Sequence, residues 1–207
     1  MFDPNQLLEL VKGQYLAYGY LIVLIAAYVE YVFPIGYFWP GGTFIMLGVV
    51  YSIDGKLSWP LIVGLVWLGA SLGNVTNYWL GQAGLLQLLK ASRFYPRFAP
   101  YLERAQRFME KRGQRAVFLS QFIGYIRPVV SVLAGTTRLP FGRFMISQVP
   151  GVLLWNIIFC GVGYLLAKTV GNIETLMSGL GLIILVIVGL SWLGLRYFTR
   201  RRQGRSG

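Results

Sequence analysis

Two ionisable residues stand inside long apolar stretches of this sequence. Glu30 lies near the end of an apolar run that begins after Gln14, and Arg127 lies inside another run, at 116–139. Charged side chains are unfavourable at membrane depth, so those that occur there indicate function. A carboxylate can bind and release a proton, and the guanidinium of Arg forms a planar fork that matches phosphate oxygens. The pair predicts a site for an anionic headgroup, with Glu30 as the proton-coupling group.

Other roles for the polar residues stay open from the sequence. Glu30 and Arg127 could form a buried ion pair that holds two segments together without chemistry. Arg138 lies near a predicted membrane interface, where its side chain can reach out to headgroups. Asn74 and Asn77 are expected to hydrogen-bond between helices rather than to contact substrate.

The composition indicates a membrane protein. Hydrophobic residues make up 56% of the 207 residues and charged residues 13%, against roughly 25% charged in a soluble domain. The absence of histidine excludes a His-based triad or a His metal site, and a single cysteine excludes an intrachain disulfide. The sequence has no nucleophile elbow, phosphate loop or carboxylate cluster, so we expect no enzyme, no cofactor and no metal.

The apolar stretches predict a single all-α membrane domain over residues 1–207. Four stretches are long enough to span a bilayer: 14–33, 57–80, 141–167 and 175–198. Two others, at 34–53 and 116–139, carry Gly and Pro residues that interrupt a helix. Broken segments at membrane depth are tolerated where protein buries them. We therefore predict two re-entrant hairpins, each returning to the side from which it entered.

The basic residues predict the orientation of these spans. With the spans above, 14 of the 19 Lys and Arg residues fall on one side, whereas Lys56 and Lys168 fall on the other. Lys and Arg favour the cytoplasmic side, which places both termini, the segment at 85–115 and the basic tail at 199–207 in the cytoplasm. The net charge of +12 therefore suits anionic lipid headgroups rather than nucleic acid.

The segment at 85–115 contains a basic amphipathic pattern. Leu102, Ala105, Phe108 and Met109 fall on one helical stripe, with charged residues between them. This pattern predicts a helix that lies on the inner leaflet. A solvated connector is the alternative.

The two broken segments lead into spans through similar landmarks. Gly48 precedes Trp67 by 19 residues, and Gly135 precedes Trp155 by 20. Chance similarity between Gly-rich and aromatic-rich spans can produce the same spacing. A true repeat would have halves that enter from opposite sides, which is the inverted-repeat plan of secondary transporters.

Several motifs occur in a fixed order from about residue 14 to residue 167. Glu30 is followed by Pro40-Gly41, residues 73–81 read GNVTNYWLG, and residues 121–127 read QFIGYIR, with Ala134-Gly135 after them. In this order the chain resembles the DedA family, also described as SNARE-associated or VTT-domain membrane proteins. The family usually has an acid at the place of Gly42, an Arg at that of Gln121 and a Pro at that of Gly124. The chain therefore resembles a divergent member.

The resemblance implies a lipid transporter of the bacterial inner membrane. It implies a flippase for a phosphorylated lipid, either undecaprenyl phosphate or a phospholipid, driven by protons or acting as an uncoupled scramblase. The expected partners are membrane lipids with anionic phosphate headgroups, and a homo-oligomer stays open. The candidate site residues are Glu30, Arg127, Gln121, Arg138, Pro40, Gly41, Gly42 and Pro128. A proton or cation antiporter with the same hairpins and a non-transporting membrane scaffold remain alternatives.

Overall fold

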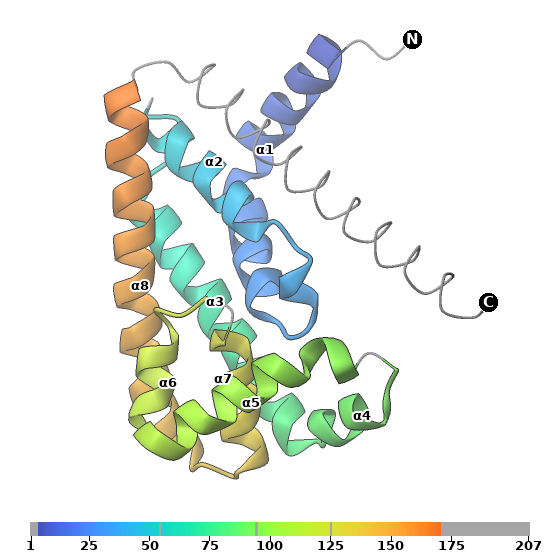
Figure 1. Ribbon diagram of the computed structural model, residues 1–207. Coiled ribbons are helices and arrows are strands. Elements are labelled where there is room, and N and C mark those ends of the chain that lie inside the picture. Colours follow the sequence, from blue (N-terminus) through green and yellow to red (C-terminus); the bar gives the residue numbers. More distant parts are fainter. Residues whose placement is uncertain (1–3, 54, 94, 125, 171–207) are drawn as a thin grey trace, which may run out of the picture. The chain divides into compact units, whose positions relative to one another are not determined.

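The computed structural model describes residues 4–53, 55–93, 95–124 and 126–170 (Figure 1). Within these ranges every regular element is helical. The elements are α1 (Pro4–Tyr31), the 3-10 turn η1 (Ile35–Tyr37), α2 (Gly41–Ile53), α3 (Trp59–Gln82), α4 (Leu85–Ala91), α5 (Tyr95–Arg112), α6 (Arg115–Ser120), α7 (Arg127–Thr136) and α8 (Phe141–Val170). The predicted all-α class is confirmed for this part of the chain.

In the described residues, α3 and α8 are long and apolar enough to cross a membrane. They correspond to the spans predicted at 57–80 and 141–167. Pro60 lies in the first turn of α3, where its missing N–H removes no helical hydrogen bond. The apolar part of α1, Tyr18–Tyr31, is shorter. The span predicted at 175–198 and the tail at 199–207 lie outside the described residues.

The helices α1 and α3 cross through a face of small residues. A Cβ atom on Gly69 would lie 3.1 Å from the Cβ of Ala27, and one on Gly73 would lie 2.7 Å from the Cβ of Tyr31. Only residues without a side chain allow two backbones to approach so closely. Gly69 and Gly73 therefore form the face of α3 that contacts α1.

A second glycine-mediated crossing joins α3 to α7. A Cβ on Gly81 would lie 2.9 Å from the carbonyl carbon of Val132, and one on Gly135 would lie 2.8 Å from that of Tyr78. The hydroxyl of Thr136 also donates to the Gly81 carbonyl oxygen, at 3.2 Å. Each helix thus contributes one glycine to the crossing, which fixes how α7 lies on α3.

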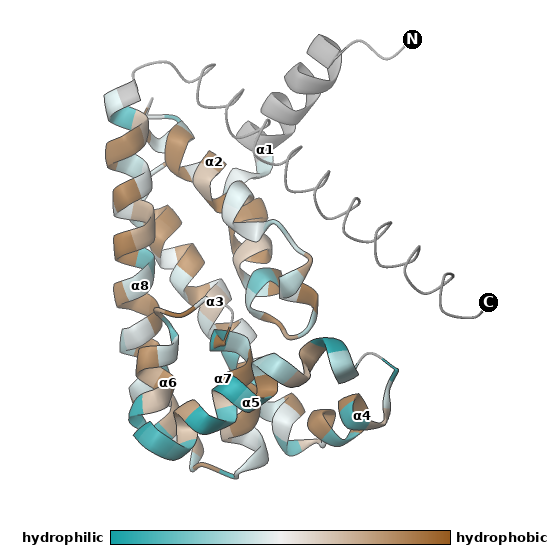
Figure 2. Ribbon diagram, in the orientation of Figure 1, coloured by the Kyte–Doolittle hydropathy of each residue, from teal (hydrophilic) through white to brown (hydrophobic). Residues whose placement is uncertain are grey.

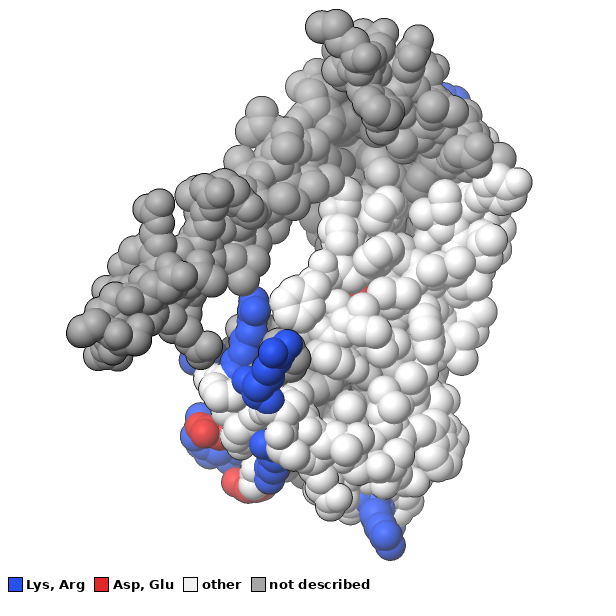
Figure 3. Space-filling model, turned by 90° about the vertical axis from the view of Figure 1, so that its right-hand side faces the viewer, with Lys and Arg blue, Asp and Glu red and all other residues white. Residues whose placement is uncertain are grey.

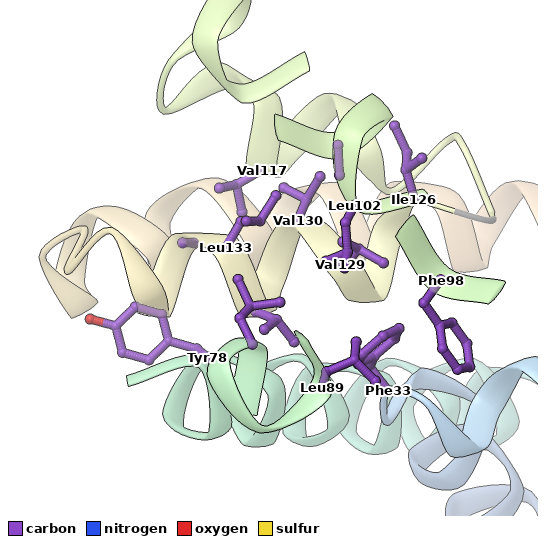
Figure 4. Close-up of a cluster of buried hydrophobic side chains, with 14 of the residues drawn as sticks. Phe33, Tyr78, Leu89, Phe98, Leu102, Val117, Ile126, Val129, Val130 and Leu133 are labelled. Atoms are coloured by element: carbon purple, nitrogen blue, oxygen red, sulfur yellow. The ribbon is translucent and has the colours of Figure 1, made fainter. Parts of the chain in front are cut away.

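A buried hydrophobic cluster surrounds this crossing (Figure 4). Val129 and Val130 of α7 are fully buried in it, together with Tyr78 of α3. The ring of Phe33 meets the ring of Phe98 edge to face, with 5.4 Å between centroids. The cluster therefore ties the turn after α1 to α5 and α7.

The predicted amphipathic stripe lies on α5 and faces protein. Leu102 and Ala105 are buried in the cluster of Figure 4, and Phe108 and Met109 pack against it. The amphipathic pattern is confirmed, with its apolar face packed on protein, and the position of this helix at the inner leaflet stays a prediction. Burial against α7 and its neighbours already removes these apolar side chains from water.

Each broken segment forms a turn between two helices. After α1 ends at Tyr31, the chain passes through η1 and returns as α2, which packs on α1. The second break separates α6, which ends at Ser120, from α7, which begins at Arg127. The residues 34–53 thus form the first turn and its returning helix. The re-entrant path through a bilayer and the inverted repeat stay predictions.

Apolar and basic residues are distributed unevenly over the described chain. The long helices are rich in hydrophobic residues, and hydrophilic residues gather on α5 and the start of α6 (Figure 2). On the face drawn in Figure 3, Lys and Arg gather toward one end, and the middle is almost free of them. This separation fits a chain that contacts both lipid and water. The orientation of the two ends stays a prediction.

Candidate functional site

Glu30 and Arg127 line one pocket of about 300 Å³. Its lining residues are Glu30, Tyr31, Gly36, Tyr37, Gly124, Arg127 and Pro128. Glu30 and Tyr31 are the last two residues of α1, and Gly36 and Tyr37 belong to η1. Arg127 is the first residue of α7. The pocket therefore lies where the two breaks in the helices meet, although Arg127 lies 96 positions after Tyr31 in the sequence.

An aromatic surface holds the guanidinium of Arg127. Its Cζ atom lies 4.4 Å from the ring centroid of Tyr31 and 5.7 Å from that of Trp155. One Nη atom donates a hydrogen bond to the Tyr31 hydroxyl. Such cation–π contacts contribute about 0.5–2 kcal/mol each. Arg carries five N–H donors, so Tyr31 orients the side chain and leaves donors for a ligand in the pocket.

The carboxylate of Glu30 lacks a full set of hydrogen-bond partners. Its Oε2 atom is buried and has no partner among the described residues. Within the same residues no ion pair of 4 Å or less joins Glu30 to Arg127, so the direct structural pair is not formed. An unpaired buried acceptor is unfavourable by about 1–3 kcal/mol, which a proton or a ligand cation would relieve.

Two glycines at the start of α2 make room for this carboxylate. A Cβ on Gly41 would lie 2.7 Å from Oε2 of Glu30, and one on Gly42 would lie 3.7 Å from the same atom. Any side chain at Gly41 would collide with Glu30. The DedA family usually has an acidic residue at the place of Gly42. Such a residue would lie beside Glu30 as a second carboxylate.

Asn77 of α3 holds the end of α1. Its Nδ2 donates to the carbonyl oxygen of Tyr31 at 2.6 Å, and its Oδ1 accepts from the backbone N–H of Phe33 at 2.8 Å. Asn77 is fully buried. These bonds satisfy backbone groups that the end of a helix leaves free, and so they fix the position of Glu30.

A cluster of amides lies behind the start of α7. Asn74 donates to the Oε1 of Gln121 at 3.3 Å and to the Oε1 of Gln148 at 3.4 Å. It accepts from the hydroxyl of Ser131 at 2.9 Å. The predicted inter-helix role of Asn74 and Asn77 is thus confirmed. The cluster connects α3 with α7, α8 and the break before α7, and so supports Arg127.

Comparison with known proteins identifies the family. Residues 39–165, more than half of the chain, match the VTT domain. The chain belongs to the VTT-domain family. The resemblance to the DedA family expected from the motifs is therefore confirmed.

The relatives of this VTT-domain chain are bacterial membrane proteins. Inner membrane protein YqjA of Escherichia coli is 29% identical over 197 residues, which cover 91% of this chain and 87% of YqjA. Protein DedA of Escherichia coli is 27% identical over 189 residues, 89% of this chain and 83% of that protein. An uncharacterized membrane protein of Synechocystis sp. is 29% identical over 140 residues. The matched residues cover 67% of this chain and 64% of that relative, which is less than two thirds of its length. No solved structure matches. The names support a location in a bacterial inner membrane.

The structure brings together part of the predicted site of this VTT-domain chain. Pro128 lines the pocket with Glu30 and Arg127, and Gly41 and Gly42 adjoin Glu30. Pro40 is exposed immediately before them.

Two other predicted residues lie elsewhere. Gln121 is fully buried in the amide cluster and does not line the pocket. Arg138 is exposed beyond the far end of α7, in a left-handed turn with φ 53°. The whole length of α7 separates it from Arg127.

Sequence reasoning missed the aromatic part of the site. Tyr31, Tyr37 and Trp155 surround the guanidinium or line the pocket. Aromatic residues are frequent throughout this VTT-domain chain, so their types alone did not distinguish them. The one available clue is that Tyr31 follows Glu30 directly.

Proposed function

We propose that this VTT-domain protein moves a phosphorylated lipid between the leaflets of the bacterial inner membrane. The observation that carries the proposal is the shared pocket of Glu30 and Arg127 at the meeting point of two helix breaks. Arg127 would bind the headgroup phosphate through donors that Tyr31 leaves free. Undecaprenyl phosphate and phospholipids both present such a phosphate.

The size of the pocket supports a headgroup as its occupant. About 300 Å³ holds a small polar group, but not the hydrocarbon chains of a lipid. The chains would stay in the bilayer, against exposed apolar residues such as Leu21 and Ile25 of α1 and Leu72 of α3. A lipid could then change leaflets with its headgroup shielded by protein and its chains in lipid.

Glu30 supplies a route to proton coupling. A proton would stabilise the neutral form of Glu30, whose buried oxygen has no partner among the described residues. The nearby guanidinium of Arg127 would stabilise the ionised carboxylate. Binding and release of a proton could therefore alternate with binding and release of the headgroup. The same observation favours a second candidate, a proton or cation antiporter in which Glu30 binds the ion and Arg127 only tunes it.

A vesicle assay separates these functions. The full-length protein is reconstituted into liposomes that hold a trace of fluorescent phospholipid, and a reductant added outside quenches the outer leaflet. The proposal predicts that the protected fraction falls below that of protein-free vesicles. A fluorescent glucosylceramide, which lacks phosphate but crosses a bilayer slowly on its own, serves as the control. No movement of the phospholipid above protein-free vesicles contradicts the proposal. Proton or cation flux without lipid movement establishes the antiporter instead.

A further inference from the structure

A second, larger pocket lies apart from the site of Glu30 and Arg127. It has a volume of about 730 Å³ and lies between the α5–α6 turn and the first part of α8. Its lining residues are Arg112, Gln114, Arg115, Phe118, Leu119, Ile146 and Ser147. None of them lines the first pocket. In Figure 1, α6 lies beside the first part of α8, in agreement with this lining.

Two arginines give this pocket its charge. Arg112 ends α5 and Arg115 begins α6, and both side chains are exposed. Among the described residues neither has a carboxylate within 4 Å. The guanidinium of Arg112 lies over the ring of Phe108, 5.7 Å from its centroid. The two side chains therefore present a pair of uncompensated positive charges at the rim.

Hydrogen bonds hold the α5–α6 turn, which carries the two arginines, against α8. The amide nitrogen of Gln114 donates to the carbonyl oxygen of Arg143 at 3.1 Å and to the hydroxyl of Ser147 at 3.1 Å. These bonds join the α5–α6 turn to α8. The distance from the arginine pair to the surface of α8 is therefore set by the fold.

The opposite wall is apolar and continues along α8. Ile146 lines the pocket with 73% of its surface exposed. Leu153 and Ile157 follow it at 7 and 11 residues, which is the spacing of one helical face, and both are exposed. Together they extend an apolar stripe away from the pocket. Figure 2 shows the hydrophilic α5–α6 region beside the hydrophobic α8.

We infer that this pocket binds an anionic phospholipid of the surrounding leaflet, with its phosphate between Arg112 and Arg115 and its chains along Ile146, Leu153 and Ile157. Two positive charges beside an apolar stripe complement a ligand that has a negative headgroup and hydrocarbon chains. A soluble anion would leave the stripe uncovered, and a neutral lipid would leave the charges unpaired. The inference goes beyond lipid movement through the first pocket and does not depend on it.

Binding is tested with the purified full-length protein in neutral detergent by native mass spectrometry. The protein is titrated with phosphatidylglycerol, and with phosphatidylcholine of the same chains. The double variant Arg112→Gln/Arg115→Gln removes the pair, and Arg107→Gln/Lys111→Gln removes the same charge from α5 outside the pocket. Because a basic residue near a lipid surface contributes about 1 kcal/mol, we expect the pair variant to bind phosphatidylglycerol at least tenfold more weakly. We expect the control variant to stay within twofold of wild type.

A further variant tests the role of the hydrocarbon chains. Ile146→Ser should weaken phosphatidylglycerol binding several-fold and leave the binding of glycerophosphate unchanged. The inference is overturned if the arginine pair variant binds phosphatidylglycerol like wild type, or if the control variant loses as much. It is also overturned if glycerophosphate binds as tightly as the lipid, which would make the pocket a plain phosphate site, or if phosphatidylcholine binds equally well. All four residues changed on α5 and α6 are exposed, so each variant should fold.

Discussion

The guanidinium of Arg127 lies on the ring of Tyr31, with 4.4 Å from Cζ to the ring centroid, and hydrogen-bonds to the hydroxyl of the same residue. Tyr31 is the last residue of α1, and Arg127 is the first residue of α7. This contact therefore joins the two helix breaks directly. Because Glu30 precedes Tyr31, the same contact brings a carboxylate and a guanidinium to one pocket without pairing them.

Replacement of Glu30 tests proton coupling. In proteoliposomes with an imposed pH gradient, wild-type protein should move the phosphorylated lipid several-fold faster than without the gradient. Glu30→Gln keeps the size of the side chain but cannot ionise, so its rate should not respond to the gradient. Glu110→Gln, at an exposed position of α5, removes the same charge and should behave like wild type. A gradient response that survives in Glu30→Gln would assign coupling to another group.

Asn77 should be required for stability. Asn77→Ala leaves the carbonyl of Tyr31 and the N–H of Phe33 without their partner. Each unsatisfied buried group is unfavourable by about 1–3 kcal/mol, so the thermal unfolding midpoint in detergent should fall clearly. Thr137→Ala is the control, because Thr137 is an exposed residue whose hydroxyl bonds only to the carbonyl oxygens of Leu133 and Ala134 at the end of α7. An unchanged midpoint in Asn77→Ala would show that the end of α1 is held in another way.

Replacing each of two glycines of α3 by alanine should have different effects on the stability of the fold. A Cβ on Gly81 would meet the backbone of Val132, whereas one on Gly64 would meet nothing within 4 Å. Gly81→Ala should destabilise the fold by about 1–3 kcal/mol, since the crossing must open. Gly64→Ala should be neutral or stabilising by up to about 1 kcal/mol, since alanine favours the helix. Thermal unfolding of the two variants gives the comparison, and equal midpoints would contradict the close crossing.

Much of the frame was predictable from the sequence because it depends on local patterns. The apolar runs predicted α3 and α8 to within a few residues. The high density of Gly and Pro predicted where the helices would break. Each of these features depends on residues close together in the chain.

Contacts between distant residues were less predictable. The sequence suggested that Glu30 and Arg127 act together, but nothing in it indicated that Tyr31 would hold the guanidinium of Arg127. Arg138 was a candidate site residue together with Arg127, although the two lie at opposite ends of α7. The apolar stripe of α5 is the same whether lipid or protein covers it, so its burial against α7 could not be read from periodicity.

The most direct test of the account compares two arginine replacements in the liposome assay for lipid movement. Arg127→Gln removes the guanidinium from the pocket, and Arg138→Gln removes the same charge from an exposed turn. Hydrogen bonds to charged groups contribute about 1.5–3 kcal/mol, so Arg127→Gln should slow the phosphorylated lipid at least tenfold. Arg138→Gln should stay within twofold of wild type, and the unfolding midpoints should show that both variants are folded. Wild-type rates in Arg127→Gln would contradict the central claim that this side chain binds the headgroup.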